Sequence, residues 1–198
     1  MHILIKNKKL IYRDYRIKCA VGKRGIRKKK EEGDFITPIG LYKINFVLYR
    51  KDRIKKLDTI LKKLIIKKNM GWCDDPKSKK YNKLINTPFT YSYEKLFRRE
   101  NIYDIILVLN YNMNPIKKNK GSAIFIHIAK KGYKSTEGCV AIKKIELSKY
   151  YILDQKNPIL DNIIKDFYLK LDMKNEIEFQ YHLKKYNLTI LDVKKKIE

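Results

Sequence analysis

The alternation of apolar and polar residues predicts short β-strands through most of the chain up to Ala141. Residues 15–21 alternate regularly, as a strand with one buried face does. Residues 105–109 and 123–126 are continuously apolar, which predicts strands that are buried on both faces. Further strands are expected at residues 2–5, 10–12 and 41–49.

The two apolar runs belong to longer predicted strands, residues 103–110 and 122–129, which a loop of about ten residues separates. A loop of this length joins antiparallel neighbours, so we expect the two strands to lie side by side in the core. Residues 7–9 similarly predict a tight turn between the first two strands.

Two segments before the last glycine depart from this strand pattern. Ser92 can cap a helix over residues 92–100, with basic side chains on its polar side. Residues 51–68 mix many lysines with isoleucine and leucine, which predicts either a short amphipathic helix or an irregular insertion.

The chain lacks glycine toward the C-terminus, since all eight glycines lie at or before Gly138. Residues 145–152 look helical, and apolar residues at helical spacing predict another helix over residues 158–171. Residues 176–183 alternate again and predict a strand, and residues 184–198 form a Lys-rich tail that is either helical or disordered.

Together these elements predict a mainly β protein with helices, of the α+β class. The chain of 198 residues suits one domain with a sizeable core. We place that domain at residues 1–183, with a helical insertion near residues 145–172 and a tail at residues 184–198.

The net charge of +26 admits two interpretations. One is a polyanionic partner, such as nucleic acid, anionic lipid or an acidic wall polymer. The other is codon usage in a genome rich in A and T, since 39 of the 47 basic residues are lysine. The lysines are spread along the chain, which argues against a dedicated nucleic-acid module and for the second interpretation.

Three cysteines, Cys19, Cys73 and Cys139, do not make a disulfide framework. The apolar start of the chain is interrupted by the charged Lys6, so the N-terminus does not resemble a signal peptide. No segment approaches the roughly 20 apolar residues of a membrane span. We therefore expect a monomer without a membrane span or a visible export signal.

One imidazole and one thiol stand close together in the sequence. His127 ends a predicted buried strand, and Cys139 follows Thr136, Glu137 and Gly138 twelve positions later. A thiol needs a base to become a strong nucleophile, and an imidazole is the usual one. A buried structural cysteine and a structural histidine are the alternative interpretation.

The pattern of His127, a gap and then Thr136-Glu-Gly-Cys139 resembles the active-site signature of the L,D-transpeptidases, the YkuD-type catalytic domain. Residues 32–40, Glu-Gly-Asp-Phe-Ile-Thr-Pro-Ile-Gly, resemble a second conserved segment of that family. Residues 71–76 and 81–82 resemble its stand-alone branch. The resemblance covers about residues 15 to 147.

The resemblance implies a β-sandwich with a few helices, and acyl transfer on peptidoglycan stem peptides. Cys139 would be the nucleophile and His127 its base. Backbone amides around Gly138 and Cys139 would form the oxyanion hole, and Thr136 would hold the loop. No metal or cofactor would be needed, the cell envelope would be the place of action, and carbapenems would acylate the thiol.

Other positions are less closely specified by the resemblance. It places residues 71–76 near the cleft, so that Trp72 and Asp74 would contact substrate. Many members carry Arg or Asn where this chain has Ala141, and Arg24 or a lysine would then have to replace that side chain. Cys73 and the two aspartates after it lack the further ligands of a metal site, so no metal is expected there.

Two alternatives from other classes remain open. A degenerate family member would bind wall peptides without catalysis, and its Cys139 would be unreactive. A basic nucleic-acid-binding protein would bind oligonucleotides tightly and with strong salt dependence, but no motif beyond charge supports it.

Overall fold

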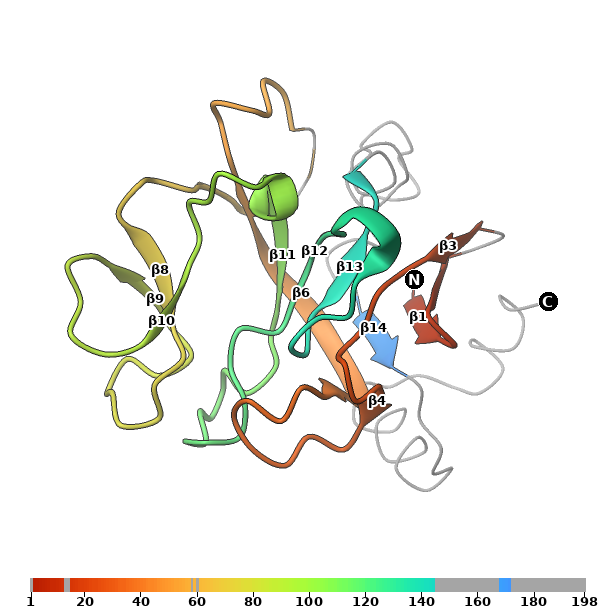
Figure 1. Ribbon diagram of the computed structural model, residues 1–198, viewed down its shortest axis with the longest axis horizontal. Helices are drawn as coiled ribbons and strands as arrows, with labels where there is room; N and C mark the ends of the chain where they lie inside the picture. Colours follow the sequence, from red (N-terminus) through yellow and green to blue (C-terminus); the bar gives the residue numbers. More distant parts are fainter. Residues whose placement is uncertain (1, 13–14, 58, 60, 145–167, 172–198) are drawn as a thin grey trace.

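The computed structural model describes residues 2–12, 15–57, 59, 61–144 and 168–171 (Figure 1). The strands are β1 (His2–Lys6), β2 (Lys9–Tyr12), β3 (Tyr15–Lys18), β4 (Ile26–Arg27), β5 (Thr37–Pro38), β6 (Gly40–Tyr49), β7 (Lys63–Ile65), β8 (Met70–Cys73), β9 (Leu84–Asn86), β10 (Tyr93–Lys95), β11 (Ile105–Leu109), β12 (Phe125–Ile128), β13 (Val140–Ile142) and β14 (Tyr168–Leu171). Two 3-10 helices, η1 (Asn101–Tyr103) and η2 (Lys131–Tyr133), accompany them.

One long sheet organises these strands. Its order is β13-β12-β11-β6-β14-β1-β2-β3, with β7 beside β6. The ten-residue β6 serves both halves, because its first part pairs with β14 and its second part with β11. Ala20, just beyond β3, exchanges two backbone hydrogen bonds of 2.8 and 2.9 Å with Ala141 of β13. The two ends of the sheet therefore meet, and its halves face each other around a core.

The strand β11 is buried on both faces, as its apolar run predicts. Ile105 and Leu107 pack in a core shared with the N-terminal strands, whereas Ile106 and Val108 pack on the opposite side. That opposite side is covered by a three-stranded sheet of order β10-β8-β9, seen as a separate layer beside β11 and β12 in Figure 1. The mainly β architecture agrees with the expected β-sandwich.

Several predicted elements are present as expected. Strands occur in each predicted N-terminal segment, and Asn7 and Lys8 form the tight turn with φ of 50° and 56°. β11 and β12 are antiparallel neighbours in the core, as the loop between them predicts. In the part of the chain described, no helix is long and apolar enough to cross a membrane.

Two predicted helices are wrong where the structure describes them. Residues 92–100 contain β10 instead, because Tyr93 and Glu94 pair with β8. Residues 168–171 form β14, which lies between β1 and β6 and takes its hydrogen bonds from both. Residues 51–68 are irregular around β7 where they are described, which matches the second of the two alternatives.

The remaining C-terminal predictions lie outside the described residues. They are the helical segment at 145–152, the rest of the helix before Tyr168, the strand at 176–183 and the tail at 184–198.

The segment between β4 and β5 is organised by one buried carboxylate. Asp34 is 6% exposed and pairs with the Lys29 ammonium. It also accepts hydrogen bonds from the backbone N–H groups of Lys30, Glu31 and Ile36. Burial acts to raise the Asp34 pKa, but Lys29 and these amides outweigh burial and lower it. This turn leads directly into Thr37, whose hydroxyl donates to the Cys139 carbonyl oxygen.

We expect Asp34→Ala to destabilise the fold by about 3–5 kcal/mol, because it leaves the Lys29 ammonium buried without its partner. The double variant Asp34→Ala/Lys29→Met should recover part of this loss, since no buried charge remains. Urea denaturation followed by circular dichroism measures both. A single variant as stable as the double variant would contradict this assignment.

Candidate active site

The pairing of β12 with β13 brings His127 and Cys139 to one face of the sheet. The two strands are parallel, with His127 opposite Ala141 and Ile126 opposite Val140. Ile126 and Val140 both pack in the core of the N-terminal strands. Because side chains alternate along a strand, His127 and Cys139 both face the β8-β9-β10 sheet.

A cavity of about 240 Å³ opens on this face. Both His127 and Cys139 line it. The other lining residues are Lys29, Glu32, Gly33, Asp74, Glu94, Arg98, Ile102, Tyr103, Ser122, Ala123, Ile124, Lys130, Lys134, Ser135, Thr136, Glu137, Gly138 and Ala141. The structure therefore gathers the predicted nucleophile, base, loop residues and Asp74 around one space.

The Cys139 thiol is partly buried and has two backbone partners. Its Sγ donates to the Ala123 carbonyl at 3.1 Å and accepts from the Phe125 N–H at 3.4 Å. Burial raises the pKa of Cys139 to about 12, although the Phe125 amide acts in the opposite direction. The resting cysteine is therefore a neutral thiol at physiological pH.

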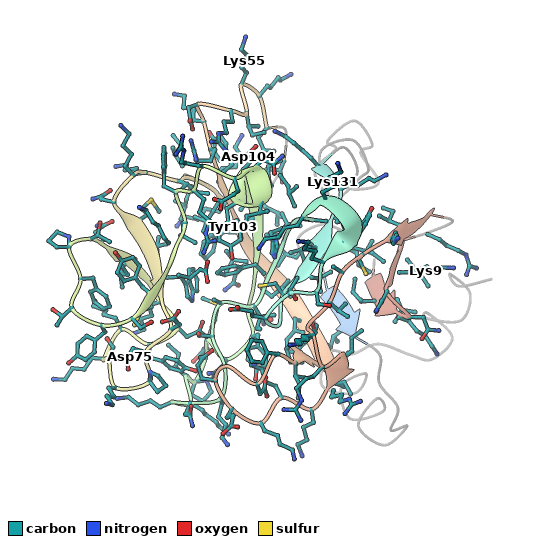
Figure 2. All side chains as sticks on the ribbon, viewed as in Figure 1. Lys9, Lys55, Asp75, Tyr103, Asp104 and Lys131 are labelled. Atoms are coloured by element: carbon teal, nitrogen blue, oxygen red, sulfur yellow. The ribbon has the colours of Figure 1, made fainter. Side chains whose placement is uncertain are left out.

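The His127 imidazole is held in a defined orientation. Its Nδ1 lies 3.0 Å from the carbonyl oxygen of Ile128, and a carbonyl can only accept, so this contact favours the tautomer with the proton on Nδ1. In that tautomer Nε2 is the basic nitrogen. The backbone of Ile102 is a second hydrogen-bond partner of the ring. Tyr103 of η1 packs edge-on against the ring at 5.3 Å between centroids, near the middle of the molecule in Figure 2. Burial lowers the His127 pKa to about 4, so the ring is neutral at pH 7.

The turn before Cys139 is fixed by side-chain and backbone contacts. Thr136 Oγ1 donates to the Cys139 carbonyl oxygen at 2.6 Å and accepts a hydrogen bond from the Gly138 N–H at 3.3 Å. Gly138 has a φ of 149°, and a Cβ there would lie 3.0 Å from the Ile36 carbonyl oxygen. A side chain at this position would be strained and crowded, so the turn favours glycine.

The distant Thr37 segment reaches the same carbonyl group. Thr37 Oγ1 lies 3.4 Å from the Cys139 carbonyl oxygen and donates to it. Thr37 is itself fixed by the Gly22 N–H, which donates to its Oγ1 at 2.7 Å. Two sequence motifs about 100 residues apart therefore meet at the backbone of Cys139.

Trp72 and Arg24 lie away from the cavity, contrary to the sequence prediction. Trp72 is 1% exposed, packs on Phe125, and donates from Nε1 to Asn82 Oδ1 at 2.9 Å. It is a core residue that joins β8 to β12. Arg24 is exposed on the turn before β4 and does not line the cavity.

The sequence prediction assigned no role in the site to Arg98, Glu94 or Tyr103, which all line the cavity. Arg98 pairs with Glu94 and lies over the Tyr103 ring at 5.1 Å. The Tyr103 hydroxyl donates to Glu94, and burial raises the pKa of both groups. The sequence prediction placed Arg98 on the polar side of a helix over residues 92–100 and gave Glu94 and Tyr103 no role, so nothing in it pointed to the cavity.

Ala141 has a place in both the core and the cavity. It is 1% exposed, lines the cavity, and its backbone holds the bridge to Ala20. A role of this position in substrate binding stays a prediction.

A protein-family model matches most of the chain. The family model of the L,D-transpeptidase catalytic domain matches residues 1–152 of the chain. A search of curated proteins found no match. The matched region contains the whole described cavity, including His127 and Cys139. The chain therefore belongs to the L,D-transpeptidase catalytic-domain family, whose members act on peptidoglycan.

Proposed function

We propose that the protein transfers or hydrolyses acyl groups of peptidoglycan stem peptides through a thioester on Cys139, with His127 as the base. The supporting observation is the placement of both side chains in one cavity on one face of the sheet. The Ile128 carbonyl holds Nδ1, which leaves Nε2 to accept the thiol proton.

The resting pair is neutral, so proton transfer accompanies the attack. The thiol leaves the Ala123 carbonyl, His127 takes its proton, and Sγ bonds to the carbonyl carbon of the third stem residue. The amides near Gly138 and Cys139 stabilise the oxyanion. His127 then gives the proton to the departing amine of the terminal D-Ala.

The thioester is resolved by one of two acceptors. An amine of a neighbouring stem gives a 3→3 cross-link, as in an L,D-transpeptidase. Water gives a shortened stem, as in an L,D-carboxypeptidase. In either case the protein acts as a monomer in the cell envelope, where its substrate is, and uses no cofactor.

A peptide-binding protein without catalysis is the second candidate. The observation in its favour is the raised pKa of Cys139, whose thiol is bonded to a backbone carbonyl. The two candidates differ in whether a covalent intermediate forms on Cys139.

We expect the purified protein to convert disaccharide tetrapeptides, because Cys139 and His127 line the same cavity. The product masses should show the loss of D-Ala, either with the addition of water in a shortened stem or in a cross-linked dimer of two stems. Cys139→Ser should abolish both products. Cys73→Ser is the matched control, since Cys73 is fully buried outside the cavity and should leave the products unchanged. Equal turnover by the Cys139→Ser variant would contradict the proposal.

Carbapenem acylation of Cys139 should slow by about 10²–10⁴-fold in His127→Ala, the usual contribution of a positioned general base. Intact-mass spectrometry follows the adduct with time. In the wild type the rate should fall below about pH 4, because protonated His127 cannot accept the thiol proton.

This acidic limb should be absent from His127→Ala. If no adduct forms on the wild type with excess drug, the peptide-binding candidate is favoured. If His127→Ala reacts as fast as the wild type, the two residues do not act as a pair.

A further inference from the structure

Three loops that meet at one edge of the molecule are unusually rich in lysine. They are residues 28–33, 77–80 and 117–120, which we call the lysine loops. The lysines are spread along the sequence, but the fold brings these three segments together at the lower left of Figure 1. Eight of their lysines are exposed, namely Lys28, Lys30, Lys77, Lys79, Lys80, Lys117, Lys118 and Lys120.

The third lysine loop contacts both of the others through its own ammonium groups. Lys118 Nζ donates to the Lys77 carbonyl oxygen at 3.4 Å. Lys120 Nζ donates to the Lys30 carbonyl oxygen at 3.2 Å. These contacts hold side chains of like charge close to one another.

Backbone groups and one buried hydroxyl fix the same arrangement. The Glu32 N–H donates to the Asn119 carbonyl oxygen at 3.1 Å, which joins the first loop to the third. Tyr81 follows the second loop, and its hydroxyl donates to Glu32 and accepts from the Gly121 N–H at 3.0 Å. The position of the loops is therefore set by the fold as well as by the exposed side chains.

Carboxylates offset few of these charges. The lysine loops contain two, and Glu32 is bonded to the Tyr81 hydroxyl, which leaves Glu31 at the surface. Asp75, just before the second loop, accepts from the Lys77 N–H. Among the described residues, none of the eight exposed ammonium groups forms an ion pair with a carboxylate. Such crowding of like charge is repulsive, and a bound polyanion would relieve it.

The residue types in the lysine loops indicate which polyanion fits. A lysine ammonium is a point charge that suits phosphate oxygens, whereas the planar fork of arginine suits carboxylates. The three loops contain no arginine and no aromatic residue. Proteins read guanine in duplex DNA mainly with arginine, and they bind single strands by stacking bases on aromatic rings. The loops therefore favour a phosphate polymer that carries no bases.

The lysine loops also border the active-site cavity. Glu32 and Gly33 of the first loop line the cavity, and so does Ser122, two residues after the third loop. A polymer bound across the exposed lysines would thus lie beside the entrance to Cys139 without having to enter the cavity.

We propose that the lysine loops form a docking surface for a linear phosphodiester polymer without bases, such as a chain of polyol phosphates. The exposed ammonium groups bind its phosphate oxygens in succession. A wall strand next to such a polymer would be held near Cys139, which raises its effective concentration at the cavity. The surface goes beyond the proposed function, because it binds its polymer whether or not Cys139 reacts.

The test measures binding of a synthetic glycerol phosphate oligomer to the full chain by calorimetry at several salt concentrations. Affinity should fall steeply with salt, because bound phosphates release their counterions. The variant Lys30→Gln/Lys77→Gln/Lys117→Gln removes one exposed lysine from each loop. It should bind about 10- to 100-fold more weakly at low salt, and its slope of log affinity against log salt should be shallower by about 2.

The matched control is Lys9→Gln/Lys51→Gln/Lys55→Gln, which removes the same charge from exposed lysines elsewhere. In Figure 2, Lys9 and Lys55 lie far from Asp75, the residue that precedes the second lysine loop. This variant should keep most of the affinity and the salt slope of the wild type. Equal losses in the two triple variants would indicate only the general field of a lysine-rich chain and would overturn the docking surface.

Two further measurements complete the test. The melting temperature of the lysine-loop variant should be unchanged or higher, because the substitutions remove repulsion without removing a printed contact of the fold's interior. Single-stranded oligothymidylate with the same number of phosphates should bind no more tightly than the glycerol phosphate oligomer. Tighter binding of oligothymidylate would indicate a nucleic-acid partner, and no measurable binding of the glycerol phosphate oligomer at low salt would leave no such surface; either result would overturn the proposal.

Discussion

The parallel pairing of β12 with β13 is the constraint on which the site depends. With His127 opposite Ala141, the period of two along each strand turns His127 and Cys139 to the same face. A register slip of one residue would send one of them into the opposite core. The bridge from Ala20 to Ala141 holds β13 from its other side, so the closure of the sheet also fixes the position of the thiol.

The same packing sets the protonation of the pair. Burial disfavours a charged imidazole and a charged thiolate alike, so both groups rest in their neutral forms. Backbone carbonyls then decide where the protons lie, Ile128 for Nδ1 and Ala123 for Sγ.

The elements that could be predicted from the sequence are those whose hydrophobic pattern or motif lies within one short segment. The apolar runs of β11 and β12 and the motif around Cys139 needed no distant partner to be recognised. Residues 92–100 were predicted as a helix from the possible cap at Ser92 and the basic residues that follow, whereas pairing with β8 makes residues 93–95 a strand. Tyr168–Leu171 adopts a strand for the same reason, since its hydrogen bonds come from β1 and β6.

The cavity wall could not be predicted in the same way, because it is assembled from distant segments. Trp72 looked available for substrate within its polar loop, but Asn82 satisfies its indole and Phe125 covers it. Ser122 and Tyr103 line the cavity only because the fold places the start of β12 and η1 beside Cys139.

The most direct test of the account is the protonation state of His127 by ¹⁵N NMR of the imidazole nitrogens across pH. Substitution of His2 and His182 by glutamine leaves one histidine signal. The account predicts a protonated Nδ1 and an unprotonated Nε2 from pH 8 down to about pH 5, with titration near pH 4. A doubly protonated His127 at pH 7, as in a thiolate–imidazolium pair, or a proton on Nε2, would contradict it.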